Sequence, residues 1–287
     1  MRRLALVALF AVACGAVPAH AQALALAYQQ GNVYKYRLHM TGTEKITSAF
    51  TSPPNPDLSS EITAQEMATV KSVDAGGVAD LSVALSNIFT KSQINGGVTS
   101  STTEPILPAE EVKIAADGRI LSINGKSTGG WTPFGVPVYS GELVSAVLAD
   151  KPVKPGDIWS KNYDTTNPGF GSGAIHVTAK SKYLRDESFQ GVNAAVIETK
   201  SDATLDLTID MSKLVPPISG IQMTTRWTKT FDVTTWIDPS GHSILKSHVT
   251  SKSAWNTTYI ASPGATMPGT IGPMSQKGDD TIDLLPA

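Results

Sequence analysis

The chain has 287 residues, with 23 Lys and Arg against 25 Asp and Glu, so its formal net charge is −2. This balance argues against a protein that binds nucleic acid through a basic face. One Cys and five His exclude a disulfide framework and a thiolate zinc site.

The first residues have the layout of a secretory signal peptide. Arg2 and Arg3 precede an apolar run from Leu4 to Cys14, and Ala19-His20-Ala21 offers small residues before a cleavage point. The run is shorter than the ~20 residues that span a bilayer as a helix. We therefore expect residues 1–21 to be removed. The mature chain should then be exported, periplasmic or extracellular, without a transmembrane helix.

Cys14 supports an alternative route to the envelope. The segment from Ala11 to Gly15 resembles the lipobox of bacterial lipoproteins, in which the Cys becomes a lipidated N-terminus. The lipobox pattern prefers Leu where this chain has Ala11. Cleavage after Ala21 instead leaves a mature chain without cysteine, and hence without a disulfide or a Cys nucleophile.

The mature chain is predicted to contain two similar β-rich halves, at residues 22–130 and 156–260. Gly31-Asn32-Val33-Tyr34 opens the first half and Gly156-Asp157-Ile158-Trp159 opens the second. Turns at Gly118 and Gly241 come near their ends. These matches favour an internal duplication, although short glycine turns also recur by chance in β proteins. Residues 131–155 are interpreted as a connector, and 261–287 as a Pro/Gly-rich tail that is extended or disordered.

Period-two alternation predicts strands in both halves. It is clean in Tyr34–Met40 and Ala203–Asp210. In the segment from Val78 to Phe89, the residues predicted on one apolar face are Ala79, Leu81, Val83, Leu85 and Phe89. One apolar and one polar face is typical of antiparallel sheet. The predicted fold is mainly β, with long antiparallel strands in a curved sheet or half-barrel and one connector helix.

The connector helix is predicted over Ser140–Leu148. Ser140 can cap it, and Leu143, Val144, Val147 and Leu148 would share one face. Just before it, Trp131 to Val138 is apolar and broken by proline, so it should cover a sheet face or meet a ligand. A curved sheet would leave a cleft there. The candidate ligand-binding residues are therefore Trp131, Phe134, Leu143 and Val147.

No catalytic, cofactor or metal motif was found. His39, His176 and His248 fall on polar strand faces and are interpreted as solvent-facing. Asp202, Asp206 and Asp210 form an acidic stripe, which is interpreted as a solvated edge that blocks aggregation. The sequence therefore predicts a protein that is not an enzyme and uses neither cofactor nor metal.

The signal peptide, the long-stranded halves, the connector helix and the entry from Lys151 to Trp159 (KPVKPGDIW) resemble secreted bacterial proteins of unknown function. The architecture is also similar to the half-barrel of periplasmic lipoprotein carriers, whose curved sheet holds acyl chains against helices. The resemblance covers Gly31 to about Tyr259 and carries over no ligand residue. The many apolar strand faces, with few helices predicted to cover them, favour a non-enzymatic protein that binds a lipid or another apolar ligand. The alternative is an envelope-associated structural or interaction protein without a small-molecule ligand.

Overall fold

The computed structural model describes residues 21–48, 55–106, 109–123, 145–166, 174–210, 219–266 and 274–287. The first half of the chain supplies β1 (Val33–Ser48), β2 (Asp57–Val73), β3 (Ala79–Ile94), β4 (Val98–Ile106), β5 (Glu110–Ile114) and β6 (Ile120–Ile123). The second supplies β7 (Ile158–Thr166), β8 (Ala174–Phe189), β9 (Val192–Asp210), β10 (Ser219–Asp238), β11 (Ser243–Thr266) and β12 (Met274–Pro286). In these described ranges no helix is long and apolar enough to cross a membrane.

All of these strands join one antiparallel 12-stranded sheet, in the order β6-β5-β3-β2-β1-β12-β11-β10-β9-β8-β7, with β4 paired to β3. The mainly β prediction is thus confirmed. Each half of the chain forms a meander, and the two meanders meet where β12 lies between β1 and β11. Residues 274–286, within the expected tail, form a central strand of the sheet. The duplication itself stays a prediction.

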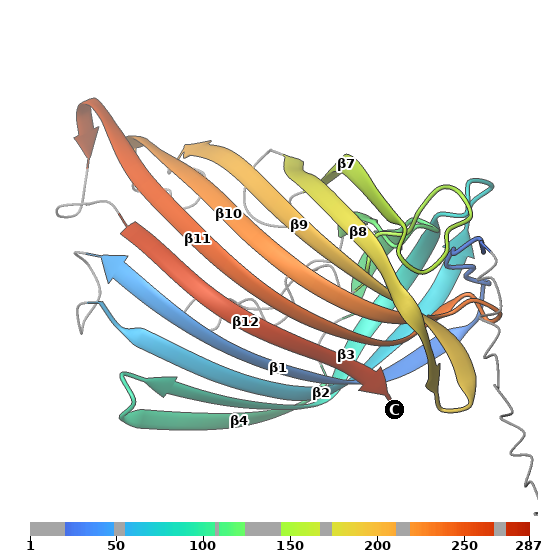
Figure 1. The fold of residues 1–287 in the computed structure, drawn as a ribbon. Helices are drawn as coiled ribbons and strands as arrows, with labels where there is room; N and C mark the ends of the chain where they lie inside the picture. The colour runs from blue at the N-terminus through green and yellow to red at the C-terminus, as the bar shows by residue number, and fades with distance from the viewer. Residues whose placement is uncertain are drawn as a thin grey trace, which may run out of the picture.

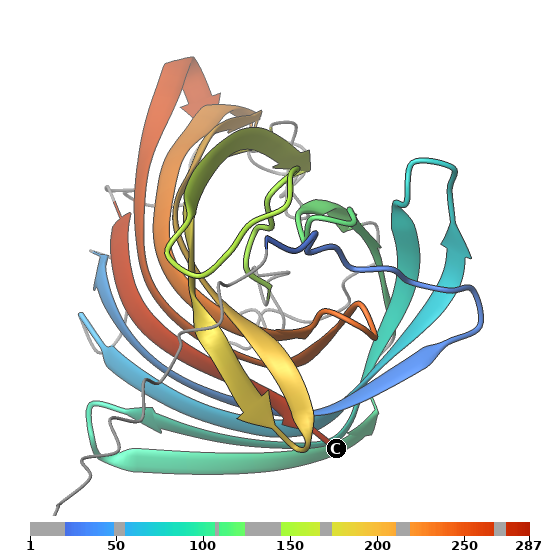
Figure 2. The same ribbon diagram turned by 45° about the vertical axis from the view of Figure 1, so that its right-hand side comes forward.

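The sheet curls so strongly that it forms a nearly closed barrel (Figures 1 and 2). Its two ends, β6 and β7, come side by side. Tyr36 and Leu38 are buried on the inner face of β1, whereas their neighbours Lys35 and Arg37 are exposed on the outer face. The predicted alternation therefore separates a core side from a solvent side.

β3 departs from the predicted alternation at one point. Asn87 has a positive φ of 51°, and the β2–β3 register shifts between Thr63 and Gln65. This bulge inserts one residue and exchanges the two faces of the strand beyond it. Ile88 is consequently buried, and Phe89, which was predicted on the apolar face, is 41% exposed.

Two segments without strand structure fill one end of the barrel. We call residues 22–28 and 145–153 together the plug. Gln22 and Val153 pair as a β-bridge. Leu26 N–H donates to the Ala116 carbonyl at 2.7 Å, and Leu148 N–H to the Asp117 carbonyl at 2.8 Å. These bonds hold apolar plug side chains inside the larger hydrophobic cluster, where Leu24, Leu26, Ala146, Leu148 and Val153 are buried.

The predicted connector helix is not formed in its described part. Ala146 N–H donates to Thr235 Oγ1 at 2.8 Å, and Val147 N–H to Thr199 Oγ1 at 2.9 Å. Because buried hydroxyl groups of the sheet take these donors, the backbone is held open instead of closing on itself. Residues 140–144 lie outside the described ranges.

Charged side chains join the two ends of the sheet where the described hydrogen-bonded ladder stops. Lys161 on β7 places its Nζ 2.5 Å from Asp117 in the β5–β6 turn and 2.5 Å from Asp150. Arg119 also pairs with Asp117 at 2.7 Å and lies 5.4 Å from the ring centre of Tyr163. Burial opposes ionisation of Asp117, but the hydrogen bond and charge of Lys161, with help from Arg119, outweigh it and lower its pKa. We call this line of contacts the seam.

Gly118 offers a test of how the plug is seated. Its φ is +84°, and an added Cβ would lie 2.6 Å from the Ala146 carbonyl oxygen. Gly191 has nearly the same φ, +83°, but its Cβ would meet nothing within 4 Å. In urea unfolding, Gly191→Ala should cost about 1 kcal/mol of backbone strain. Gly118→Ala should cost ~3 kcal/mol or more, because it also displaces the plug. Equal losses would contradict the plug contact.

Candidate functional site

The register of the sheet places inward side chains in rows that cross the strands. One such row is mostly polar, although the next row toward the plug is mostly apolar. Its members on successive strands β2, β1, β12, β11, β10 and β9 are Ser60, Gly42, Asp280, Ser251, Phe231 and Ser201. The adjacent row adds Glu44 and Lys229 from β1 and β10. We call the polar members of these two rows the polar belt.

Lys229 and Asp280 form the centre of the polar belt. The Lys229 side chain is 6% exposed, and its Nζ lies 3.3 Å from Asp280 Oδ2. Burial lowers the pKa of Lys229, which the neighbouring Asp280 carboxylate partly offsets. Ser251 Oγ donates to the same carboxylate oxygen at 3.3 Å. Gly42 makes room for this carboxylate, since a Cβ there would lie 2.7 Å from Asp280 Oδ1.

Glu44 ends the polar belt on β1. Its Oε2 atom is buried and has no hydrogen-bond partner. Burial, and then repulsion from Asp280, raises the pKa of Glu44 to about 7. Ser201 Oγ, on the other side of the belt, is also buried without a partner. Two buried polar atoms of the belt, Glu44 Oε2 and Ser201 Oγ, are therefore left without hydrogen bonds.

A second buried carboxyl group lies nearer the plug. Glu66 on β2 is 5% exposed, and its Oε2 atom has no hydrogen-bond partner. Burial raises the pKa of Glu66 to about 7. It lies directly opposite Tyr36 on β1, while Tyr34 lies on the diagonal. Tyr28 of the plug contacts the Tyr34 ring edge-on, with centroids 5.6 Å apart. We call these four residues the Glu66 cage.

The inner face of β10 and β11 is aromatic at the end away from the plug. Trp227 and Trp255 are cross-strand partners with ring centroids 5.9 Å apart. Met223 and Tyr259 are partners one step further along the same strands. All four side chains are only half-buried. We call this group the aromatic end.

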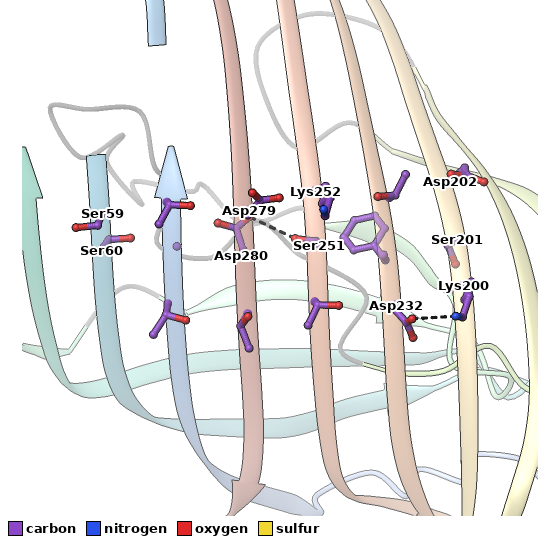
Figure 3. A pocket seen from close by; sticks show the side chains of 17 residues that line it. Ser59, Ser60, Lys200, Ser201, Asp202, Asp232, Ser251, Lys252, Asp279 and Asp280 are labelled. Carbon is purple, nitrogen blue, oxygen red and sulfur yellow. Dashed lines mark hydrogen bonds and ion pairs between the residues drawn. The ribbon is translucent and has the colours of Figure 1, made fainter. Parts of the chain in front are cut away.

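The outer face of the sheet carries a trough of about 750 Å³ across six strands (Figure 3). Most of its lining residues occupy the alternate strand positions that face outward. A strongly curled sheet is saddle-shaped, which leaves its outer face concave along the strands. Within the trough, Lys200 on β9 and Asp232 on the neighbouring β10 form an ion pair at 3.2 Å. Thr and Ser hydroxyl groups supply much of the remaining lining. This surface is suited to water and polar partners.

Of the candidate residues from the sequence, Val147 alone falls within the described ranges. It is fully buried in the plug, and its carbonyl accepts hydrogen bonds from Ser181 Oγ at 2.7 Å and Trp159 Nε1 at 2.9 Å. It therefore supports the plug and does not line an open cleft. Trp131, Phe134 and Leu143 lie outside the described residues.

Sequence reasoning missed Glu66, Lys229 and Asp280. Each of these residues could have been noticed as a charged residue at a position where the alternation of its strand predicts an apolar, inward-facing side chain. Glu66 follows Ile62 and Ala64 at that parity, and Lys229 lies between Trp227 and Phe231. The strand histidines His39, His176 and His248 lie beside Glu61, Asp164 and Asp283 on exposed positions. Within the described part of the chain, no three potential metal-ligating side chains gather.

Comparison with known proteins gives little further guidance. No protein-family model and no curated protein matches the chain. OccK5 (OpdH) of Pseudomonas aeruginosa is 10% identical, covering 88% of this chain and 98% of that one, with a TM-score of 0.23. An outer membrane channel of Pseudomonas putida F1 is 9% identical, covering 91% and 97%, also with a TM-score of 0.23. Scores this low carry no argument about fold or function.

The polar belt predicts an asymmetry between the two faces of the sheet. Asp280→Asn removes the carboxylate that lies 3.3 Å from the buried Lys229 ammonium group, and so should cost about 3 kcal/mol of folding free energy. Asp232→Asn removes the same charge from an exposed pair on the outer face and should change stability little. Chemical denaturation of both variants checks this, and equal effects would argue against a buried ion pair.

Glu66 predicts a pH dependence of stability. Its folded pKa of about 7 lies above its ordinary value of 4.5, so the folded state holds a proton that the unfolded state loses between these values. Its contribution is therefore complete below pH 4.5 and is lost as pH rises to 7. This loss amounts to about 3 kcal/mol. Glu66→Gln should flatten the fall in unfolding free energy across that window. Parallel curves for the two proteins would refute a buried neutral Glu66.

Proposed function

We propose that this chain is an exported, non-enzymatic envelope protein that shelters an apolar ligand, such as a lipid or acyl chain, inside its curled sheet. The observation that carries the proposal is the aromatic end. Its side chains point inward, yet they are only half-buried. At the opposite end the plug covers the inner face, and the apolar side chains there are buried.

The aromatic end has the chemistry that an apolar chain would bind. Aromatic rings offer large apolar surfaces, and burial is worth about 25 cal/mol per Å² of apolar surface removed from water. Met223 is unbranched and adapts to irregular ligand shapes. Leu205 on β9 and Ile175 on β8 continue the same surface, since Ile175, Met223 and Trp227 all pack against Leu205. The polar belt lies next to this region and would stop a chain from running further toward the plug.

The outer face favours a protein surrounded by water over one whose strands face lipid. Outward positions of β9 to β11 carry residues such as Lys200, Asp202, Thr230, Thr250 and Lys252. Strands that span a bilayer present a continuous apolar band outward, flanked by aromatic girdles. We infer export from the signal peptide in residues 1–21, or membrane attachment through Cys14 if the lipobox is used.

The second candidate function is an envelope-associated structural or interaction protein without a small-molecule ligand. The polar trough on the outer face favours it, because paired charges and hydroxyl groups suit a protein surface as a partner. Under this alternative the inner face serves only stability.

Titration with a fluorescent fatty acid, such as dansyl-undecanoic acid, separates the two candidates. Trp227→Ala or Trp255→Ala should weaken binding at least tenfold, which corresponds to about 1.4 kcal/mol. The matched control is Trp236→Ala, because Trp236 lies on the same strand and instead donates a hydrogen bond to Glu187 and contacts Lys246. It should leave binding unchanged.

The connector residues belong in the same titration. Trp131→Ala and Phe134→Ala should weaken fatty-acid binding if the connector contributes to the ligand site. A parent protein that binds no fatty acid at all would overturn the apolar-ligand proposal and leave the structural alternative.

A further inference from the structure

The carboxyl group of Glu66 is buried, and its Oε2 atom has no hydrogen-bond partner. Among the described residues Glu66 is the one Asp or Glu in the fully buried class, and no ion pair involving it is formed within the described chain. A buried carboxyl group without a partner costs folding free energy, and a ligand that pairs with it would offset this cost.

The rings around Glu66 are those that recognise organic cations. Tyr36 lies opposite it on β1, and Tyr34 is two residues further along the same face. Tyr28 reaches in from the plug and meets Tyr34 at an interplanar angle of 89°. Aromatic rings set at steep angles offer their faces to a cation from more than one side.

The tyrosine hydroxyl groups do not satisfy Glu66. The Tyr36 hydroxyl donates to the Ile244 carbonyl at 3.0 Å, which directs it away from the carboxyl group. From β3 the residue opposite Glu66 is Leu85. The groups that face Glu66 are thus three uncharged phenols and an apolar side chain, and none supplies a positive charge.

We propose that the Glu66 cage binds a small organic cation, an ammonium group that carries methyl or alkyl substituents. The Glu66 carboxylate would supply the countercharge, and the faces of Tyr28, Tyr34 and Tyr36 would contact the substituents. A divalent metal ion fits less well, because hard cations require several oxygen ligands and the cage offers one carboxyl group. Tyr28 and Tyr34 are only half-buried, so solvent contacts part of each of these side chains.

The cage makes cation binding dependent on pH. Only ionised Glu66 supplies the countercharge, so binding should strengthen as pH rises through about 7, where Glu66 titrates. Tyr28 and Tyr36 stay neutral throughout this range, because burial raises the pKa of each well above its ordinary value.

This site goes beyond the proposed function. The ammonium group has two sources, a small free quaternary ammonium ion such as choline or the head group of an amphiphile. The amphiphile would connect the cage with the apolar inner face, whereas a small free cation would not.

Isothermal titration calorimetry of the exported protein tests the proposal with four probes. These are tetramethylammonium, choline, 3,3-dimethyl-1-butanol as the neutral isostere of choline, and dodecyltrimethylammonium below its micelle concentration. The cationic probes should bind at pH 8, and about 30-fold more weakly at pH 5.5 as the carboxylate fraction falls. The neutral isostere should not bind.

Variants separate the carboxylate from the rings. Glu66→Gln has nearly the same shape and should weaken cation binding at least 30-fold. Tyr34→Ala should weaken it about tenfold, whereas Tyr34→Phe keeps the ring face and should stay within threefold of the parent. Because Tyr34 is half-buried, this pair remains informative even if Glu66→Gln folds poorly. Equal binding by Tyr34→Ala and Tyr34→Phe would overturn the cage.

The outcomes also distinguish this site from the apolar-ligand function. Binding of choline that depends on Glu66 supports a site for a small free cation, and binding of dodecyltrimethylammonium alone that depends on Glu66 supports a head-group site. If dodecyltrimethylammonium binds the parent and Glu66→Gln equally but is lost in Trp227→Ala, the cation site is refuted and the apolar function stands. If no cation binds while the fatty acid does, the cation site is likewise refuted.

Discussion

The pairing of β12 with β1 is the constraint on which the rest of this structure depends. It runs in unbroken register from Tyr36 opposite Pro286 to Ser48 opposite Met274. Without it the chain would form two separate meanders, each with an unprotected edge. With it, inward side chains line up in rows across both halves, so Asp280 lies beside Gly42 and reaches Lys229. The polar belt, the continuous core and the meeting of β6 with β7 all follow from this one ladder.

Much of the sheet was predictable, because alternation is a local property of a strand and needs no knowledge of its partners. The errors arose where distant parts of the chain decide local structure. The residues around Val147 have a helical pattern, but Thr199 and Thr235 bind their backbone donors and hold them open. Phe89 faces outward because the bulge at Asn87 exchanges the faces of β3. Such effects depend on register between strands, which no local pattern contains.

The candidate site was harder to predict than the fold, for a related reason. Single charged residues at inward positions look like minor irregularities of alternation. Glu66 and Lys229 gain meaning only when register shows what lies opposite each of them: Tyr36 and Leu85 for Glu66, and small residues for Lys229. Sequence reasoning therefore turned to the connector, where aromatic residues and prolines are conspicuous. A charged residue at an inward-facing strand position is the feature of the sequence that could have indicated the polar belt and the Glu66 cage.

At the seam the described part of the barrel is not closed by backbone hydrogen bonds. Strands elsewhere in the sheet are joined by ladders of backbone hydrogen bonds, whereas no described ladder joins β6 to β7, and Lys161 on β7 pairs there with Asp117 in the turn before β6. Amide groups that border this line should exchange their hydrogens with solvent sooner than those of β1 and β12, which are paired on both sides. The inner face could then be reached from the side, by parting a few charged contacts, while every ladder of the sheet stays intact.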